Sequence, residues 1–296
     1  KSTCNNFINE TFKNNQHLEN KSKSNLGCFT FQPTTEVIMA KMLISLDSKS
    51  SPGHSGIPIK VLQLNEAKII PFLTELFADS IKSERFPDEL KTAIASPLFK
   101  DKGSPENLNN YRLISILSPV NKLFEKILAE QMRIFLEMSG LISEEQHGFR
   151  TNHSCESALQ ELISSCNDNR DKRLISILLF VDFKKAFDMI DSELLLIKLM
   201  NYGFTNSAIA LIRDYFRSRR QQVKIGDARS SFTNINLGVP QGSVLGPLLF
   251  LVFINDLPRF LGPIYTKLFA DDTTMLFNGK DVEQCITQCK KGIEKL

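Results

Sequence analysis

Two apolar runs joined by a pair of adjacent acids constrain this chain most. Residues 267–277 alternate apolar and polar side chains, which predicts a β-hairpin with Asp271 and Asp272 at its turn. Upstream, residues 174–182 form a mostly apolar run that predicts a buried strand ending in Asp182. Acids in a turn can be there for solvation alone. Three carboxylates at strand ends can instead hold two divalent metal ions for in-line phosphoryl transfer.

Length and composition set broad limits on the fold. The 296 residues, of which 42% are apolar, suffice for one large domain or two closely packed ones. The longest apolar run, residues 244–254, predicts a buried helix and is too short to cross a bilayer, so we expect no membrane segment. The six cysteines form no compact disulfide framework, which favours reduced thiols in an intracellular protein.

Helical and strand patterns are interleaved along the chain, which indicates an α+β or α/β domain. Residues 1–30 are polar and rich in asparagine, and we predict a linker or arm there. Helices are predicted near 35–46, 59–82 (bent near Pro71), 119–137, 154–166, 192–202, 206–218, 246–257 and from 282 onward. Strands are predicted at 92–99, 174–182, as a pair within 221–237, and in the acidic hairpin.

The strongest basic cluster lies in residues 213–229, which contain six Arg or Lys residues and only two acids. It includes Arg217, Arg219 and Arg220, with two aromatic residues nearby. The net charge of the whole chain is only +3, so any nucleic-acid interface depends on such local clusters. The cluster is either a track for a phosphate backbone or a solvated charged face.

Seven segments, in the same order, resemble the motifs of one enzyme family. They are SPGHSG at 51–56, PLFK at 97–100, NYRLIS at 110–115, QHGFR at 146–150, FVDFKKAFD at 180–188, GVPQGSVLGP at 238–247 and FADD at 269–272. The family is the reverse transcriptases of non-long-terminal-repeat retrotransposons, the jockey-like class. The resemblance covers roughly residues 30–296.

This resemblance implies an α+β right-hand polymerase fold, with an antiparallel palm sheet packed on helices. Fingers, with early palm elements, are expected over residues 31–170 and the palm over residues 171–296. The family's next motif and its thumb would follow residue 296, so we expect a fragment truncated before the thumb.

The implied function is that of an RNA-directed DNA polymerase from a mobile element. Its substrates would be an RNA template, a DNA primer and deoxynucleoside triphosphates. Its cofactor would be Mg²⁺, or Mn²⁺ in its place. An intracellular location in the nucleus, the cytoplasm or both follows from the same resemblance.

The resemblance also assigns roles to the residues at the strand ends. Asp182, Asp271 and Asp272 would be the catalytic metal ligands. Phe183 would contact the incoming nucleotide, and Phe187 would be a steric gate that collides with a ribose 2′-hydroxyl. Without the resemblance, the simpler interpretation of Phe187 is an ordinary core residue, since the chain has 22 Phe.

Further residues would contact substrates from the fingers and from the turn between the two acid motifs. Lys100 and Arg112 would contact the triphosphate, since Arg presents fixed donors and Lys a point charge. Gln241 and Gly242 would lie against the nucleotide, and Arg150 would contact nucleic acid. The alternatives are a solvated surface pair for Lys100 and Arg112, and a glycine-rich turn before a helix for Gln241 and Gly242.

Other functions remain open at this point. Ser55 and Leu113 stand where the family usually has Asp and Pro, which places the finger loops in doubt but not the acids. The main alternative is a catalytically silent nucleic-acid-binding remnant or domesticated fragment. A further alternative is another two-metal phosphotransferase or nuclease, which would have no use for a deoxynucleotide gate.

Overall fold

The computed structural model describes residues 27–296, so most of the predicted N-terminal arm lies outside the described residues. Residues 27–30 do not belong to an arm. Phe29 is buried, forms a parallel bridge with Phe204, and packs its ring against Phe31 and Phe135. The burial of this aromatic ring overrides the polar composition around it.

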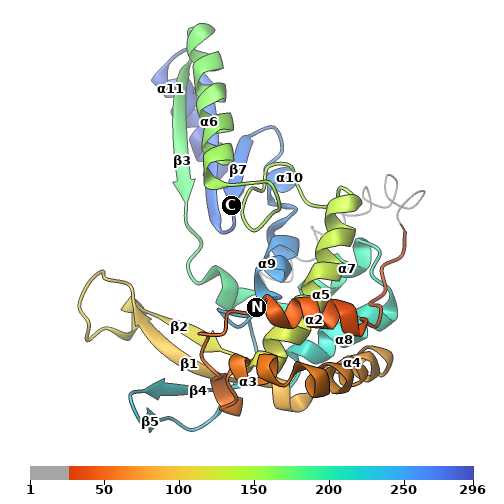
Figure 1. The fold of residues 1–296 in the computed structure, drawn as a ribbon. Helices are drawn as coiled ribbons and strands as arrows, with labels where there is room; N and C mark the ends of the chain where they lie inside the picture. Colours follow the sequence, from red (N-terminus) through yellow and green to blue (C-terminus); the bar gives the residue numbers. More distant parts are fainter. Residues whose placement is uncertain (1–26) are drawn as a thin grey trace.

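The chain is an α+β protein, as predicted (Figure 1). Its main helices are α2 (Glu36–Ile44), α3 (Ile59–Leu64), α4 (Glu66–Lys82), α5 (Pro119–Met138), α6 (Cys155–Asp171), α7 (Ser192–Asn201), α8 (Asn206–Phe216), α9 (Gly246–Ile254), α10 (Leu257–Leu261) and α11 (Val282–Ile293). Its strands are β1 (Thr92–Phe99), β2 (Tyr111–Ile116), β3 (Ile175–Val181), β4 (Arg220–Ile225), β5 (Ala228–Arg229), β6 (Thr233–Asn234), β7 (Tyr265–Phe269) and β8 (Asp272–Gly279). No helix within residues 27–296 is both long and apolar enough to span a membrane.

Local polar side chains set several helix ends. Thr35 begins α2, where its hydroxyl accepts a hydrogen bond from the Ile38 N–H. The predicted long helix over residues 59–82 is two helices, and the break is at Asn65 rather than at Pro71. The Asn65 side chain donates to the Val61 carbonyl at 2.8 Å, a local bond that competes with helix continuation.

Two sheets organise the molecule. The first has the order β2-β1-β4-β5, with β6 also on β4; β1 and β4 run parallel and the other pairs antiparallel. The second is antiparallel, in the order β3-β8-β7. Strand β2 was not predicted, because only its pairing with β1 shows that residues 100–110 are a hairpin loop rather than the end of the extended region.

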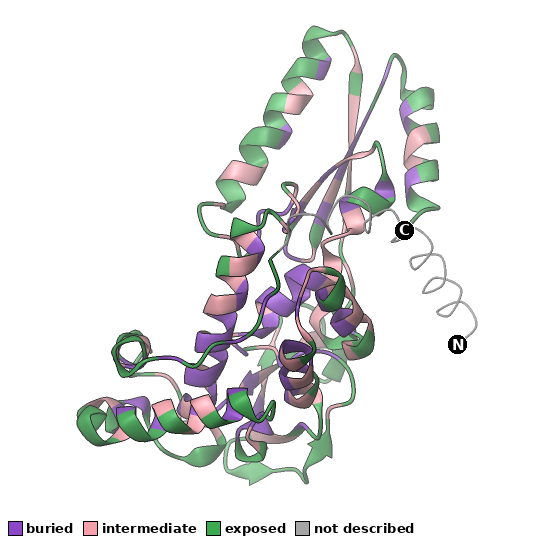
Figure 2. Cartoon of the chain, turned by 90° about the vertical axis from the view of Figure 1, so that its right-hand side faces the viewer, coloured by how far each residue is buried: buried purple, intermediate pink, exposed green. Residues whose placement is uncertain are grey.

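A helical body holds most of the buried apolar residues, and a smaller cluster lies under the antiparallel sheet (Figure 2). The smaller cluster joins Leu261, Met275 and Phe277 between that sheet and helices α10 and α11. The main cluster draws on α2, α4 and α5 as well as α7, α8 and α9. Since helices on both sides of residue 170 share one core, the division into fingers and palm stays a prediction.

A buried ion pair lies within this shared core. Glu125 of α5 is completely buried, and its Oε2 accepts hydrogen bonds from the N–H groups of Val244 and Leu245 at 2.7 and 3.1 Å. Its Oε1 lies 3.8 Å from Nη2 of buried Arg219, whose Nη1 donates to the Tyr215 carbonyl. One carboxylate therefore neutralises a buried guanidinium and caps the turn that leads into α9.

We expect Glu125→Ala to lower the free energy of unfolding by about 3–5 kcal/mol, because it leaves a buried guanidinium without its counter-charge. Urea unfolding measures this loss. The matched control is Glu130→Ala, which removes a partly exposed ion pair on the same helix and should cost less than about 1 kcal/mol. Equal losses in both variants would show that the pair has no special role.

Candidate active site

The register of the antiparallel sheet brings two of the three acids together. The last recorded pairs of β3 and β8 are Phe180 with Thr274 and Val181 with Thr273. One step further, the same register places Asp182 opposite Asp272. Directly opposed residues of an antiparallel pair point to the same face, so both carboxylates project from one side of the sheet at its open end.

The third acid occupies the β7–β8 turn. Phe269 pairs with Asp272, which leaves Ala270 and Asp271 as the two turn residues. Burial, and then the neighbouring charges of Asp272 and Asp182, raise the pKa of Asp271 above its ordinary value of 3.8, and Arg112 opposes them. Arg112 lies on β2 of the other sheet, so predicted site residues from three distant segments come within electrostatic range of Asp271.

The three acids offer the donor atoms that a divalent cation needs. Among residues 27–296, no group of three or more His, Cys, Asp or Glu side chains is already arranged as metal ligands. The donors here are nonetheless carboxylate oxygens, which Mg²⁺ and Mn²⁺ prefer. Mg²⁺ commonly uses one or two carboxylates and completes its octahedron with water and substrate phosphates. The acids therefore fit such an ion by donor type and by the mutual repulsion that a cation relieves.

The 238–242 turn contacts β2 and the short 3-10 turn that follows β3. Gly238 and Gly242 have φ values of +79° and +107°, and a Cβ on either would meet backbone atoms of Asp188 or Ser115 within 2.7 Å. The backbone carbonyl of Gln241 accepts a hydrogen bond from the Ser115 N–H, and its side-chain Nε2 donates to Asp188 Oδ1 at 2.8 Å. Close packing thus requires glycine at both positions, which agrees with the glycine-rich turn that the sequence also allowed. Contact of Gln241 and Gly242 with a nucleotide stays a prediction.

Two aromatic residues follow Asp182. Phe183 is half-buried directly beyond the strand end. Phe187 lies in a short 3-10 turn (Ala186–Met189) and stacks on Phe250 of α9, with ring centroids 4.5 Å apart. The ring of Phe187 is thus held rigidly but is not fully buried, and its role as a gate stays a prediction.

The predicted partner of Arg112 is held by its own loop. The Lys100 Nζ donates to the Asn109 carbonyl at 3.0 Å, and its N–H donates to the Asn110 carbonyl. In the described part of the chain, no recorded hydrogen bond or ion pair connects Lys100 with the three acids. Its role toward a triphosphate stays a prediction.

With this geometry described, comparison with known proteins decides the family. The family model "Reverse transcriptase (RNA-dependent DNA polymerase)" matches residues 100–296, more than half of the chain. The chain belongs to the reverse transcriptase family.

Relatives of this reverse transcriptase domain come from mobile elements. The probable RNA-directed DNA polymerase from transposon X-element of Drosophila melanogaster is 30% identical over 247 residues, covering 82% of this chain and 27% of the relative. The RNA-directed DNA polymerase from mobile element jockey of the same species is 25% identical, covering 81% of this chain and 27% of the relative. The resemblance to jockey-like enzymes is confirmed, and the chain spans about 27% of the length of these relatives.

Two of the basic residues with a predicted nucleic-acid role have partners within this reverse transcriptase domain. Arg219 is 2% exposed and serves Glu125 in the core, because the side chain of this position points inward just before β4 begins. Arg150 donates from every guanidinium nitrogen to the protein, with Glu137 as its ion-pair partner at 2.8 Å. Burial leaves the Arg219 side chain without access to a nucleic acid, so that prediction was wrong: a basic cluster in the sequence does not show which of its members the core uses. The nucleic-acid role of Arg150 stays a prediction.

Arg217 and Arg220 remain exposed. Arg220 donates its Nε to Thr92 Oγ1 and lies over the ring of Phe232, with 4.9 Å between its Cζ and the ring centroid. Neither residue faces a carboxylate in a recorded ion pair of the described chain, so both stay predicted contacts for a phosphate backbone.

One functional residue was missed. The carboxamide of Gln146 reaches the backbone of Ala270 in the acidic turn, although Gln146 lies more than a hundred positions upstream. The only sequence signal was its place in the 146–150 segment, which resembles a family motif.

We expect Asp271→Asn to raise the melting temperature of the metal-free chain at pH 7. The raised pKa means that the folded chain pays for the charged form, so wild-type stability falls as pH rises above 3.8 and through the raised pKa. The difference between the two proteins should vanish below that window. Thermal unfolding with a chelator at pH 7 and near pH 3 measures it.

The matched control is Asp101→Asn, in an exposed loop where Asn tolerates the positive φ of 52°. It should leave the melting temperature unchanged. Mg²⁺ should then raise the melting temperature of the wild type more than that of Asp271→Asn. An equal rise in melting temperature in Asp271→Asn and Asp101→Asn would contradict a role for the raised pKa of Asp271.

Proposed function

We propose that this chain is the polymerase portion of a mobile-element RNA-directed DNA polymerase, which adds deoxynucleotides to a primer on an RNA template. The observation that carries the proposal is the convergence of Asp182, Asp271 and Asp272 at one end of the antiparallel sheet, with Arg112 of the other sheet within electrostatic range of Asp271. Family membership supports the reaction type, and the relatives support the mobile-element origin.

Asp182, Asp271 and Asp272 would hold Mg²⁺ or Mn²⁺. When bound, such ions lower the pKa of the primer 3′-hydroxyl and neutralise charge on the transferring phosphoryl group. Arg112, from the other sheet, would add fixed donors toward the triphosphate, with Lys100 as a nearby point charge. Because phosphoryl transfer asks for little covalent chemistry, positioning by rigid strands does most of the work of this chain.

The remaining proposed roles concern the nucleotide and the duplex. Gln241 and Gly242 would contact the nucleotide; the hydrogen bonds of Gln241 with Ser115 of β2 and with Asp188, six residues after Asp182, support this role. Phe183 and Phe187 would flank its sugar. The exposed arginines around β4 would follow the phosphate backbone of the template and primer. Such an enzyme would meet its RNA and DNA in the cytoplasm, the nucleus or both.

Primer extension tests the proposal directly. The assay uses an RNA homopolymer primed with DNA, poly(rA)/oligo(dT), with dTTP and Mg²⁺. We expect extension by the wild type, its loss in Asp271→Asn, and its retention in Asp101→Asn, because only the first variant removes a metal-binding carboxylate. Salt-sensitive binding of the duplex with no extension would instead support the silent nucleic-acid-binding fragment.

The gate has a separate test. We expect Phe187→Val to raise the use of rUTP relative to dTTP by about tenfold, because the smaller side chain leaves room for the 2′-hydroxyl. Single-nucleotide incorporation measures the ratio of kcat/KM for the two substrates. Phe72→Val, on the exposed face of α4, is the matched control and should keep the wild-type ratio. An unchanged ratio in Phe187→Val would remove the gate assignment.

A further inference from the structure

A buried carboxamide holds the backbone of the acidic turn. Gln146 is 1% exposed, and its Oε1 accepts hydrogen bonds from the N–H groups of Ala270 and Gly148 at 2.9 and 2.8 Å. Its Nε2 donates to the Ala270 carbonyl at 3.4 Å. One side chain thus engages both backbone groups of Ala270, as a paired strand would, and restrains the peptide planes on both sides of this residue.

The residue held in this way is in an unusual conformation. Ala270 has a φ of +56°, a region that L-residues other than Gly, Asn and Asp seldom adopt. It directly precedes Asp271 in the two-residue turn. A left-handed alanine persists only where the surroundings over-determine it, and the two hydrogen bonds from Gln146 supply that restraint.

Close packing fixes the same contact from the other side. A Cβ on Gly148 would lie 2.2 Å from the Ala270 nitrogen, so only glycine permits this approach of the two backbones. The His147 N–H donates to the Leu268 carbonyl at 2.8 Å, and the Leu268 N–H donates to the Glu145 carbonyl at 2.9 Å. Residues 145–148 therefore pair with the edge of β7 as far as the turn.

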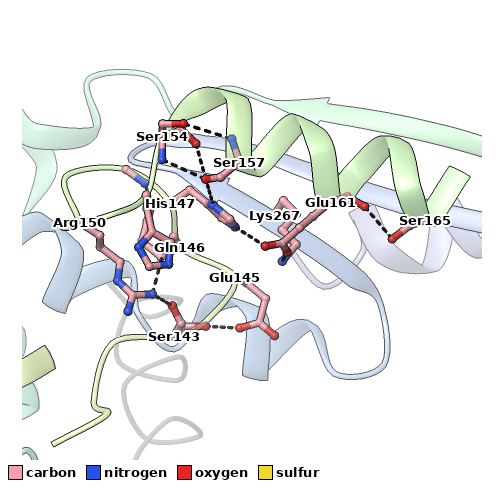
Figure 3. Close-up of polar contacts among 12 residues, drawn as sticks. Ser143, Glu145, Gln146, His147, Arg150, Ser154, Ser157, Glu161, Ser165 and Lys267 are labelled. Atoms are coloured by element: carbon pink, nitrogen blue, oxygen red, sulfur yellow. Dashed lines mark hydrogen bonds and ion pairs between the residues drawn. The ribbon is translucent and has the colours of Figure 1, made fainter. Parts of the chain in front are cut away.

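The 145–148 segment is itself anchored to the helices around it (Figure 3). The buried His147 ring contacts Ser157 Oγ on α6 at 2.9 Å, while Glu161 of α6 pairs with Lys267 on β7. Arg150 donates a hydrogen bond to the Gln146 carbonyl. It also pairs with Glu137 of α5. The 145–148 segment is thus held in place by two helices, α5 and α6, and not only by its contact with the acidic turn.

We propose that Gln146 is a positioning residue of the active site: by holding the Ala270 peptide groups, it sets the direction in which Asp271 presents its carboxylate. The inference rests on the proposed polymerase function. In this role Gln146 acts through the backbone of the turn, with which its carboxamide makes its hydrogen bonds. Misdirecting a catalytic group by about 1 Å can cost about 10²-fold in rate.

The test replaces Gln146 by Met, which fills a similar volume without hydrogen bonds. The matched control is Gln63→Met, which removes a partly buried carboxamide bonded to the carbonyls of Leu43 and Leu46, far from the turn. In primer extension, Gln146→Met should lower kcat by about 10²-fold while the KM for dTTP changes by less than about threefold. Gln63→Met should keep the wild-type kcat.

Hydrogen exchange followed by mass spectrometry gives a readout that is independent of activity. Gln146→Met should accelerate exchange of peptides that contain residues 268–272 and leave those of β3 unchanged. Adding Ala270→Gly to Gln146→Met should recover about tenfold in kcat, because glycine adopts the positive φ without help. A side chain that merely fills the core would give neither result.

Wild-type kcat in Gln146→Met, or acceleration of exchange throughout α5 and α6, would overturn the assignment. The two failures are distinguishable. If the wild type extends no primer, the proposed function fails, and exchange at residues 268–272 still decides whether Gln146 holds the turn. If the wild type extends primer and Gln146→Met does so equally, only the positioning role fails.

Discussion

The register between β3 and β8 is the constraint on which the rest of the site depends. Side chains alternate between faces, so a slip by one residue would send Asp182 to the opposite side of the sheet. The register is enforced on both faces. On one, Leu179 and Met275 pack toward α10 and α11; on the other, Asn169 of α6 bridges the paired positions Ser176 and Asn278 by hydrogen bonds. The acids are thus positioned by contacts several residues away along the strands, so the side chains at the strand ends are not needed to hold the sheet together.

Close backbone contacts then join this sheet to the other functional segments. The 238–242 turn approaches β2 through Gly242 and the 186–190 segment through Gly238, and Glu125 holds the residues that follow the turn. On the far side, Gly148 and Gln146 meet the acidic turn. Each junction combines a glycine with a polar side chain. The glycine permits the close approach, and the polar side chain forms hydrogen bonds with backbone groups that would otherwise lack a partner. Rigid placement of this kind is what a reaction dominated by positioning requires.

Much of the fold could be predicted from the sequence because its signals are local. Apolar periodicity located the helices, and the strand ending in Asp182 and the acidic hairpin stood out by alternation and length. Non-local facts could not be obtained this way. Strand β2 depends on its pairing with β1, and Phe29 on aromatic partners more than a hundred positions away. Arg219 looks like one more member of a basic cluster until its buried partner Glu125 is known, and nothing in the sequence pairs Arg150 with Glu137. Gln146 shows no pattern of its own, since its role is a contact with a distant turn.

The most direct test of this account is a count of divalent ions at the three acids. Electron paramagnetic resonance of Mn²⁺, with a primed template whose primer lacks a 3′-hydroxyl and with dTTP present, reports the ions bound per chain. We expect two bound ions in the wild type and loss of at least one in Asp182→Asn, since Asp182 would be one of the carboxylates that hold them. Equal binding in both proteins would contradict it, because the strand register would then serve the fold and not a metal centre.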